Sequence, residues 1–62
     1  MARYRHDTKY GPVEIVTRSI DDGWVASISE SQIPVTLPPD AGPVPLLEDE
    51  AVDRLLERID RS

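Results

Sequence analysis

The residues that could do chemistry are few in this chain and lie far apart along it. Its 62 residues include no cysteine and one histidine, His6, which excludes thiolate nucleophiles and sites built from several imidazoles. The adjacent carboxylates of Asp21 and Asp22 precede Gly23, a pattern typical of a turn rather than of a metal site. No base is expected near any of four serines: Ser19, Ser27, Ser29 and Ser31. The sequence therefore predicts no catalysis, no cofactor and no metal.

Basic and aromatic residues alternate near the start of the chain: Arg3, Tyr4, Arg5, Lys9 and Tyr10. Guanidinium and aromatic side chains interleaved in this way can pair with phosphates and stack on bases. Residues 1–11 could instead form a flexible basic arm, or hold an edge strand over residues 2–8 whose tyrosines cover the core. Because the net charge of the whole chain is −5, we treat nucleic acid as an alternative partner, not the expected one.

A β-hairpin is predicted after this N-terminal segment, because the alternation of side chains indicates strands at residues 13–20 and 24–30. A two-residue loop at Asp22-Gly23 would pair Thr17 with Ile28, whereas a three-residue loop pairs Ile20 with Trp24. We favour the three-residue loop, because it gathers five apolar side chains on one face: Val16, Ile20, Trp24, Ala26 and Ile28. Trp24 is the expected core anchor, and the stem of Arg18 is expected to lie along it with the charge in water.

A proline-rich connector at residues 31–45 and a helix at residues 46–60 complete the chain. A short edge strand at 33–37 is compatible with the proline there. The helix is predicted from an apolar stripe with helical spacing, which Leu47 extends: Ala51, Val52, Leu55, Leu56 and Ile59. The fold class is therefore α+β, with a small antiparallel sheet of two or three strands and the helix packed on the face that includes Trp24.

The length limits the chain to a single small domain, 1–62, whose core is too small for much stability without help. Since disulfides and thiolate metal sites are excluded, association is the expected source of that help, either as a homodimer or with an unidentified protein partner. A basic segment on an acidic body could pair with a neighbouring copy. No apolar run approaches the roughly 20 residues of a membrane span and no signal peptide is visible, so we expect a cytoplasmic protein with no membrane partner.

The runs Val13–Val16 and Asp22–Ile28 resemble the opening hairpin of HicB-like antitoxin domains. In that family a strand, an acidic-glycine turn and an aromatic-led second strand are followed by a short third strand and a helix. The resemblance covers residues 12–30, with a helix in the compatible order. It implies a dimeric domain that binds and masks a toxin.

The sequence thus predicts a noncatalytic protein-interaction or regulatory module that self-associates or binds a larger protein. Its alternatives are nucleic-acid binding through the N-terminal segment and the toxin-masking role that the resemblance implies. The candidate partner-binding residues are Arg3, Tyr4, Arg5, Tyr10 and Arg18.

Overall fold

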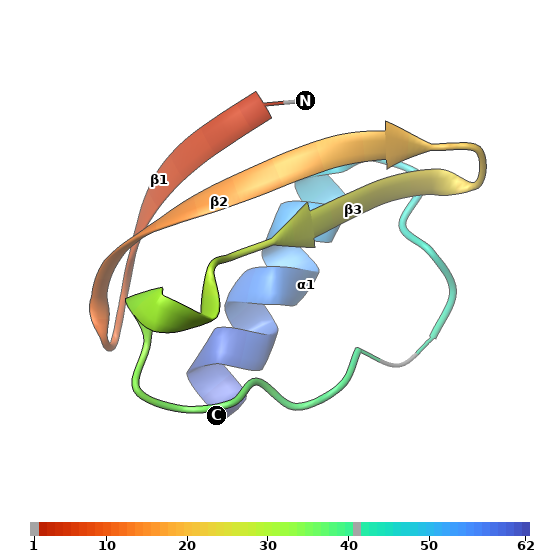
Figure 1. Cartoon of the computed structure of the whole chain (residues 1–62). Coiled ribbons are helices and arrows are strands. Elements are labelled where there is room, and N and C mark those ends of the chain that lie inside the picture. The colour runs from red at the N-terminus through yellow and green to blue at the C-terminus, as the bar shows by residue number, and fades with distance from the viewer. Residues whose placement is uncertain (1, 41) are drawn as a thin grey trace.

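The structure is a computed structural model that describes residues 2–40 and 42–62, and it has three antiparallel strands and one helix (Figure 1). The elements are β1 (Ala2–Thr8), β2 (Gly11–Ile20), β3 (Gly23–Ser27), a short 3-10 turn (Glu30–Gln32) and α1 (Glu48–Arg61). The strands follow one another in the order β1-β2-β3, and α1 packs against the sheet. The predicted α+β class is confirmed, and of the two alternatives for residues 1–11, a flexible arm or a strand at 2–8, the structure has the strand.

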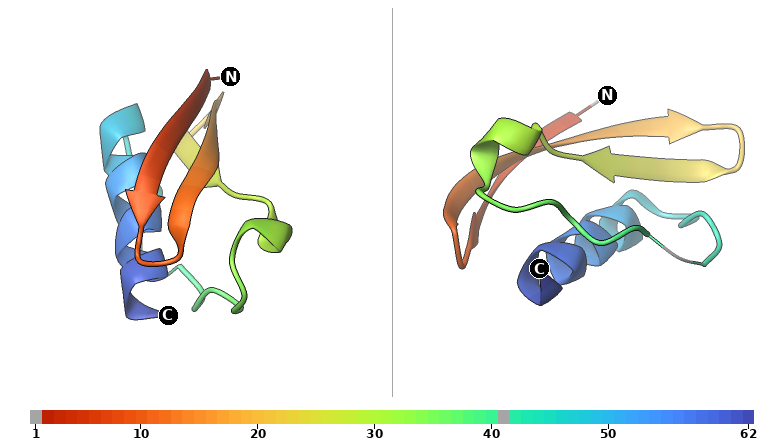
Figure 2. Two further views of the ribbon diagram at one scale, coloured as in Figure 1. Left: turned by 90° about the vertical axis from the view of Figure 1, so that its left-hand side faces the viewer. Right: turned by 60° about the horizontal axis from the view of Figure 1, so that its bottom comes forward.

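The two faces of the sheet differ in what lies on them, and Figure 2 shows α1 and the connector on the same side. We call this side the covered face. Because residues opposite each other in an antiparallel pair share a face, the register assigns every side chain of the sheet. The covered face holds Tyr4, His6, Val13, Ile15, Thr17, Trp24 and Ala26. The other side, the open face, holds Arg3, Arg5, Asp7, Glu14, Val16, Arg18, Ile20 and Val25.

The register of the second hairpin differs from both predicted loops. Ile20 pairs with Gly23 and Ser19 with Trp24, so the loop is Asp21-Asp22. The favoured three-residue loop was therefore wrong by one residue, which moves Val16 and Ile20 to the open face. The rejected two-residue loop would have placed the side chains on the correct faces, but its strand pairing differs from the observed one by two residues along β3. Gly23 makes the observed turn feasible, because its φ of 149° is accessible to glycine and strained in other residues.

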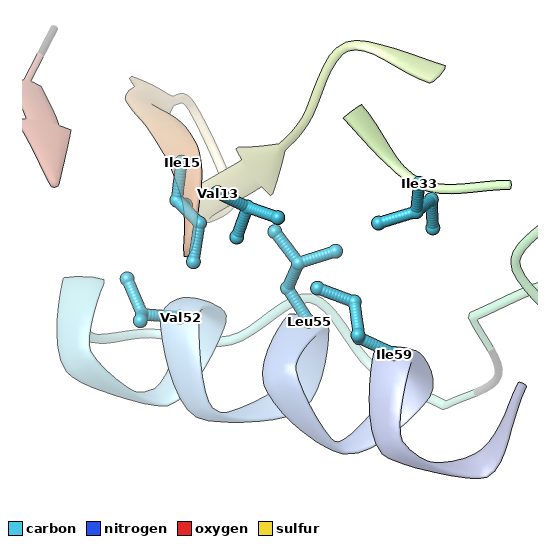
Figure 3. Close-up of a cluster of buried hydrophobic side chains, with 6 residues drawn as sticks. All are labelled: Val13, Ile15, Ile33, Val52, Leu55 and Ile59. Carbon is cyan, nitrogen blue, oxygen red and sulfur yellow. The ribbon is translucent and has the colours of Figure 1, made fainter. Parts of the chain in front are cut away.

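The core lies between β2 and α1, where Val13 and Ile15 point at the helix stripe (Figure 3). Ile15 is fully buried, and Val52, Leu55 and Ile59 meet it from the helix. Trp24 lies on the covered face as predicted, but it is only half-buried and stands outside this cluster. The expectation that Trp24 anchors the core was therefore wrong. The branched side chains of β2 fill the space at the middle of the helix instead.

The proline-rich connector is held against the rest of the molecule by hydrogen bonds to its carbonyl groups. Arg58 Nε donates to the Pro38 oxygen at 2.9 Å, and Arg54 donates to the Pro43 oxygen. At its far end the Pro45 oxygen accepts the Trp24 N–H at 2.9 Å. A segment without backbone partners of its own thus lies in a defined place because helix arginines and β3 supply donors.

Residues 33–37 form no strand in the described chain, contrary to one of the sequence predictions. The place beside β2 that such a strand would take is filled by a side chain. Gln32 Oε1 accepts the Glu14 N–H at 2.6 Å, and Gln32 Nε2 donates to the Glu14 oxygen at 3.0 Å. The Gln32 amide therefore satisfies the backbone of β2 just beyond the end of β3.

The helix begins two residues later than predicted and ends one residue later. Glu48, Asp49 and Glu50 form its first turn, where carboxylates favour the positive end of the helix dipole. Leu47 precedes the helix and is 60% exposed, so it does not extend the buried stripe as expected. Within residues 2–40 and 42–62, no helix combines the length and the apolar character that crossing a membrane requires.

Candidate functional site

Three of the five residues proposed to bind a partner lie together on the open face. Arg3 and Arg5 are alternate residues of β1, and Arg18 lies on β2. Arg3 donates to Glu14 Oε1 at 3.3 Å, with both side chains largely exposed. Arg5 and Arg18 are exposed and have no hydrogen-bond or ion-pair partner among the residues described. Their guanidinium donors are therefore available to an anionic group on another molecule.

Apolar side chains separate the arginines on this face. Val16 lies opposite Arg3 and two positions before Arg18 on the same strand. Val25 lies opposite Arg18 on β3, and Ile20 at the end of β2 is 39% exposed. The open face thus combines arginines with half-buried and exposed aliphatic side chains, and arginine is enriched in protein interfaces. The sequence did not indicate Val16, Val25 and Ile20 as part of the site. The register predicted for the hairpin placed Val16 and Ile20 in the core.

Charge is unevenly distributed between this face and the helix. The open face carries Arg3, Arg5 and Arg18 against two carboxylates, those of Asp7 and Glu14. Helix α1 carries six carboxylates against three arginines. A chain of net charge −5 therefore presents a weakly basic surface on one side of its sheet, and an acidic ligand would meet least repulsion there.

The structure places Tyr4 on the covered face, away from the arginines. Its hydroxyl donates to Glu48 Oε1 at 2.6 Å, and the hydroxyl of the buried Thr17 donates to Glu48 Oε2 at 2.7 Å. The hydrogen bond from Tyr4, with a second from Thr17, holds the pKa of the Glu48 carboxyl below its usual value. The same bond raises the pKa of Tyr4, and burial and Asp49 add to that shift. This cluster ties β1 and β2 to the first turn of α1.

Tyr10 makes a corresponding contact at the other end of the helix. Its hydroxyl donates to the main-chain oxygen of Ser62 at 3.0 Å. The neighbouring Lys9 Nζ donates to the main-chain oxygens of Asp60 and Ser62, at 2.8 and 2.7 Å. A cation and a hydroxyl thus satisfy carbonyl groups that the last turn of a helix leaves without partners. Both tyrosines bind the chain to itself in this structure, so neither is presented beside the arginines for base stacking.

Two further features bear on chemistry. In the described part of the chain, no three side chains of the metal-ligating types come together. A groove between the end of β3, the connector and α1 has a volume of about 210 Å³. It is bordered by Ile28, Ile33, Leu37 and Leu55, and it is smaller than the roughly 300 Å³ at which ligand pockets begin.

Comparison of the chain with protein-family models, with curated proteins and with solved structures finds no match in any of the three. The assignment of a role must therefore rest on the residues and contacts described above.

Proposed function

We propose that this chain is a noncatalytic protein-interaction module and that its binding surface is the open face of the sheet. The observation that carries the proposal is the position of Arg5 and Arg18, exposed and without partners among the described residues, beside the half-buried side chains of Val16 and Val25. Arginine on an apolar background is a frequent source of binding energy in interfaces, because it combines donors with a largely apolar stem. The partner is a larger protein that presents carboxylates around aliphatic side chains. A toxin, as the resemblance to antitoxin domains implies, would be one such partner.

Nucleic acid remains the alternative partner for the same arginines. Phosphate would pair with the guanidinium groups as carboxylate does. The absence of an aromatic side chain from the open face favours carboxylate, because Tyr4 and Tyr10 lie elsewhere and donate to the helix. The two kinds of partner respond differently to nuclease and to salt, and this separates them.

The test is affinity capture from a cell lysate with three tagged proteins: wild type, Arg18→Ala and Arg61→Ala. Arg61 is the matched control, since it is an exposed arginine on α1 with only a loose ion pair to Glu57 at 3.9 Å. We expect a protein that survives nuclease treatment to be retained by wild type and Arg61→Ala, and to fall about tenfold with Arg18→Ala. Equal retention by all three proteins would refute the open face as the binding surface. Retention of nucleic acid that is lost as salt rises would support the alternative.

A further inference from the structure

The two edges of the sheet are not equivalent. At the edge of β3 the connector is already docked, since the Trp24 N–H donates to the Pro45 oxygen at 2.9 Å. At the edge of β1, no segment of the described chain pairs with the strand, and Figure 1 shows its outer side without a neighbouring ribbon. Unpaired strand edges attract other strands unless something covers them. The outer edge of β1 is therefore the place where this fold can accept another strand.

The direction of the backbone groups at this edge follows from the ladder. The Trp24 N–H points out of the sheet, so Trp24 and Ser19 are a pair that exchanges no hydrogen bonds. Along antiparallel strands, residues that form hydrogen bonds to one neighbouring strand alternate with residues that do not. The odd-numbered residues of β2 therefore form hydrogen bonds with the even-numbered residues of β1. The N–H and C=O groups of Arg3, Arg5 and Asp7 consequently point outward.

We propose that a second copy of this chain occupies that edge, with the two β1 strands antiparallel about a twofold axis at Arg5. The three strands of each copy then form one continuous sheet of six. This register pairs the whole of Ala2–Thr8 with its counterpart, and each outward N–H of Arg3, Arg5 and Asp7 meets an outward carbonyl. The edge of β1 is separate from the open face, and strand pairing there does not depend on the binding role proposed for that face.

The charges of β1, together with the length of the paired segment, favour this register. Arg3 lies opposite the partner's Asp7, and by symmetry the pair occurs twice. At the axis Arg5 lies opposite its own copy, and each of these arginines has Glu14 directly opposite on its other side, on the same face. A register displaced by two residues would place Arg3 opposite the partner's Arg5 twice, with like charges in contact. A displacement of two residues the other way would place Arg5 opposite the partner's Asp7, but it would pair only residues 4–8 of each strand. The proposed register is therefore the one that pairs the whole strand and also keeps Arg3 away from the partner's Arg5.

The covered face has room for this arrangement. Tyr4 would lie opposite the partner's His6, an aromatic pair of the kind that Tyr4 and His6 already form within one copy at 6.4 Å. Helix α1 packs mainly against β2 and β3, and an open groove of about 340 Å³ is bordered by Tyr4 and His6 of β1 and by Asp49, Val52 and Asp53 of the helix. Three inter-strand steps of about 4.8 Å place β2 roughly 14 Å from the partner's β2, more than the 8–10 Å at which helices pack. The two helices therefore do not collide.

The test is sedimentation equilibrium over a concentration series with four forms of the full chain: wild type, Arg3→Asp, Asp7→Arg and the double exchange. Wild type is expected to reach twice its mass of 6.9 kDa. Each single variant places like charges opposite each other twice and should raise the dimer dissociation constant about tenfold or more. The double exchange restores opposite charges and should return that constant to within about threefold of wild type. Circular dichroism is used to check that each variant is folded.

A second measurement locates the contact. Amide hydrogen exchange at low and high protein concentration should show protection rising with concentration at Arg3, Arg5 and Asp7, but not at Tyr4 or His6, whose N–H groups already bond to β2. A wild type that stays monomeric, a double exchange that fails to restore the dimer, or protection confined to β3 would each overturn the proposal.

The outcome is separable from that of the proposed function. Arg18 is on β2, one position beyond the last residue paired with β1, and it lies opposite Val25 of β3. Arg18→Ala is expected to change the dimer dissociation constant by less than about twofold, whatever it does to capture of a partner.

Discussion

The covered and open faces of the sheet are built from the same strand and from similar residues. Toward the helix β2 presents Val13, Ile15 and Thr17, and to the open face it presents Val16, Arg18 and Ile20. Yet Thr17 is completely buried and Ile20 is 39% exposed. The difference lies in what each set meets, because only one face has the apolar stripe of α1 and the carboxylate of Glu48 beneath it. Burial in so small a protein is decided by the opposing element more than by the strand itself.

The largest effect is expected from a pair of identical substitutions, Ile15→Ala and Ile20→Ala. Ile15 is fully buried against the helix, so its truncation leaves a cavity and should lower the free energy of unfolding by about 3 kcal/mol. Ile20 is on the open face, and its loss should cost under about 1 kcal/mol. Urea unfolding followed by circular dichroism measures both. Similar losses in the two variants would mean that the assignment of the faces is wrong.

A smaller difference in stability is expected between two alanine variants of glycines, one of which lies where β3 meets the connector. A Cβ added at Gly23 would lie 2.1 Å from the Pro45 oxygen, whereas a Cβ at Gly11 would meet nothing within 4 Å. Both glycines have positive φ, so each alanine variant should carry backbone strain of about 1–3 kcal/mol. Gly23→Ala must also displace the connector and should be the more costly by about 1 kcal/mol or more.

Thermal unfolding of the two glycine variants, measured side by side, tests this difference. The fluorescence of Trp24, which is next to Gly23 and bonded to Pro45, should change in the native state of Gly23→Ala alone. Equal melting temperatures and unchanged fluorescence would show that the connector does not lie against β3.

Trp24→Ala distinguishes a residue on the covered face from a residue of its core. Trp24 is half-buried and outside the cluster around Ile15, so the loss of unfolding free energy should be about 1–2 kcal/mol. Truncation of a core anchor, the role that the sequence predicted for Trp24, would cost about 3 kcal/mol or more. A loss as large as that of Ile15→Ala would restore Trp24 to the role of core anchor.

The smallest effect compares two carboxylates, one on each side of the sheet, through Glu48→Gln and Glu14→Gln. An amide has one acceptor oxygen and can replace only one of the two bonds that Glu48 accepts from Tyr4 and Thr17. Glu14 forms an exposed ion pair of the kind that contributes little. At neutral pH, Glu48→Gln should therefore lower the melting temperature more than Glu14→Gln does.

The pH dependence of the melting temperature tests whether Glu48 acts through its charge. Because the pKa of Glu48 is lower in the folded protein than in the unfolded chain, its stabilisation is complete above the ordinary glutamate pKa and is lost as the pH falls through the lowered value. Melting temperatures measured from neutral pH into acid should therefore converge for wild type and Glu48→Gln. A gap between them that does not change with pH would indicate that Glu48 acts by packing alone.

Much of the fold could be predicted because it depends on local pattern. The turn at Asp21–Gly23 and the helical spacing of Val52, Leu55 and Ile59 each produce their element almost regardless of context. The register could not be predicted from β2 and β3 alone, since β2 is apolar on both faces. The choice depended on which face the helix would cover, and that is a contact between distant parts of the chain.

Only part of the candidate site could be predicted, again because contacts between distant residues decide the rest. Arg3, Arg5 and Arg18 could be named from their charge, because arginines without a local partner stay at the surface. Tyr4 and Tyr10 were named with them, although each donates to an end of the helix more than forty residues away. Nothing in their local pattern indicates those partners. A tyrosine can cover a core and hydrogen-bond at its rim, and only the fold decides which group it reaches.

The sequence by itself determined the hairpin of β2 and β3, the helix that follows it, and the lack of cysteine and of a second histidine. It also determined that Arg18 would lie on a strand, since alternation and helical spacing act over a few residues. Only the tertiary structure decided which face of the sheet became the core, that Gln32 would complete the ladder of β2, and that the tyrosines would bond to the helix. The physical reason is that these outcomes depend on contacts between residues distant in the chain, and such contacts form only when the whole chain has packed.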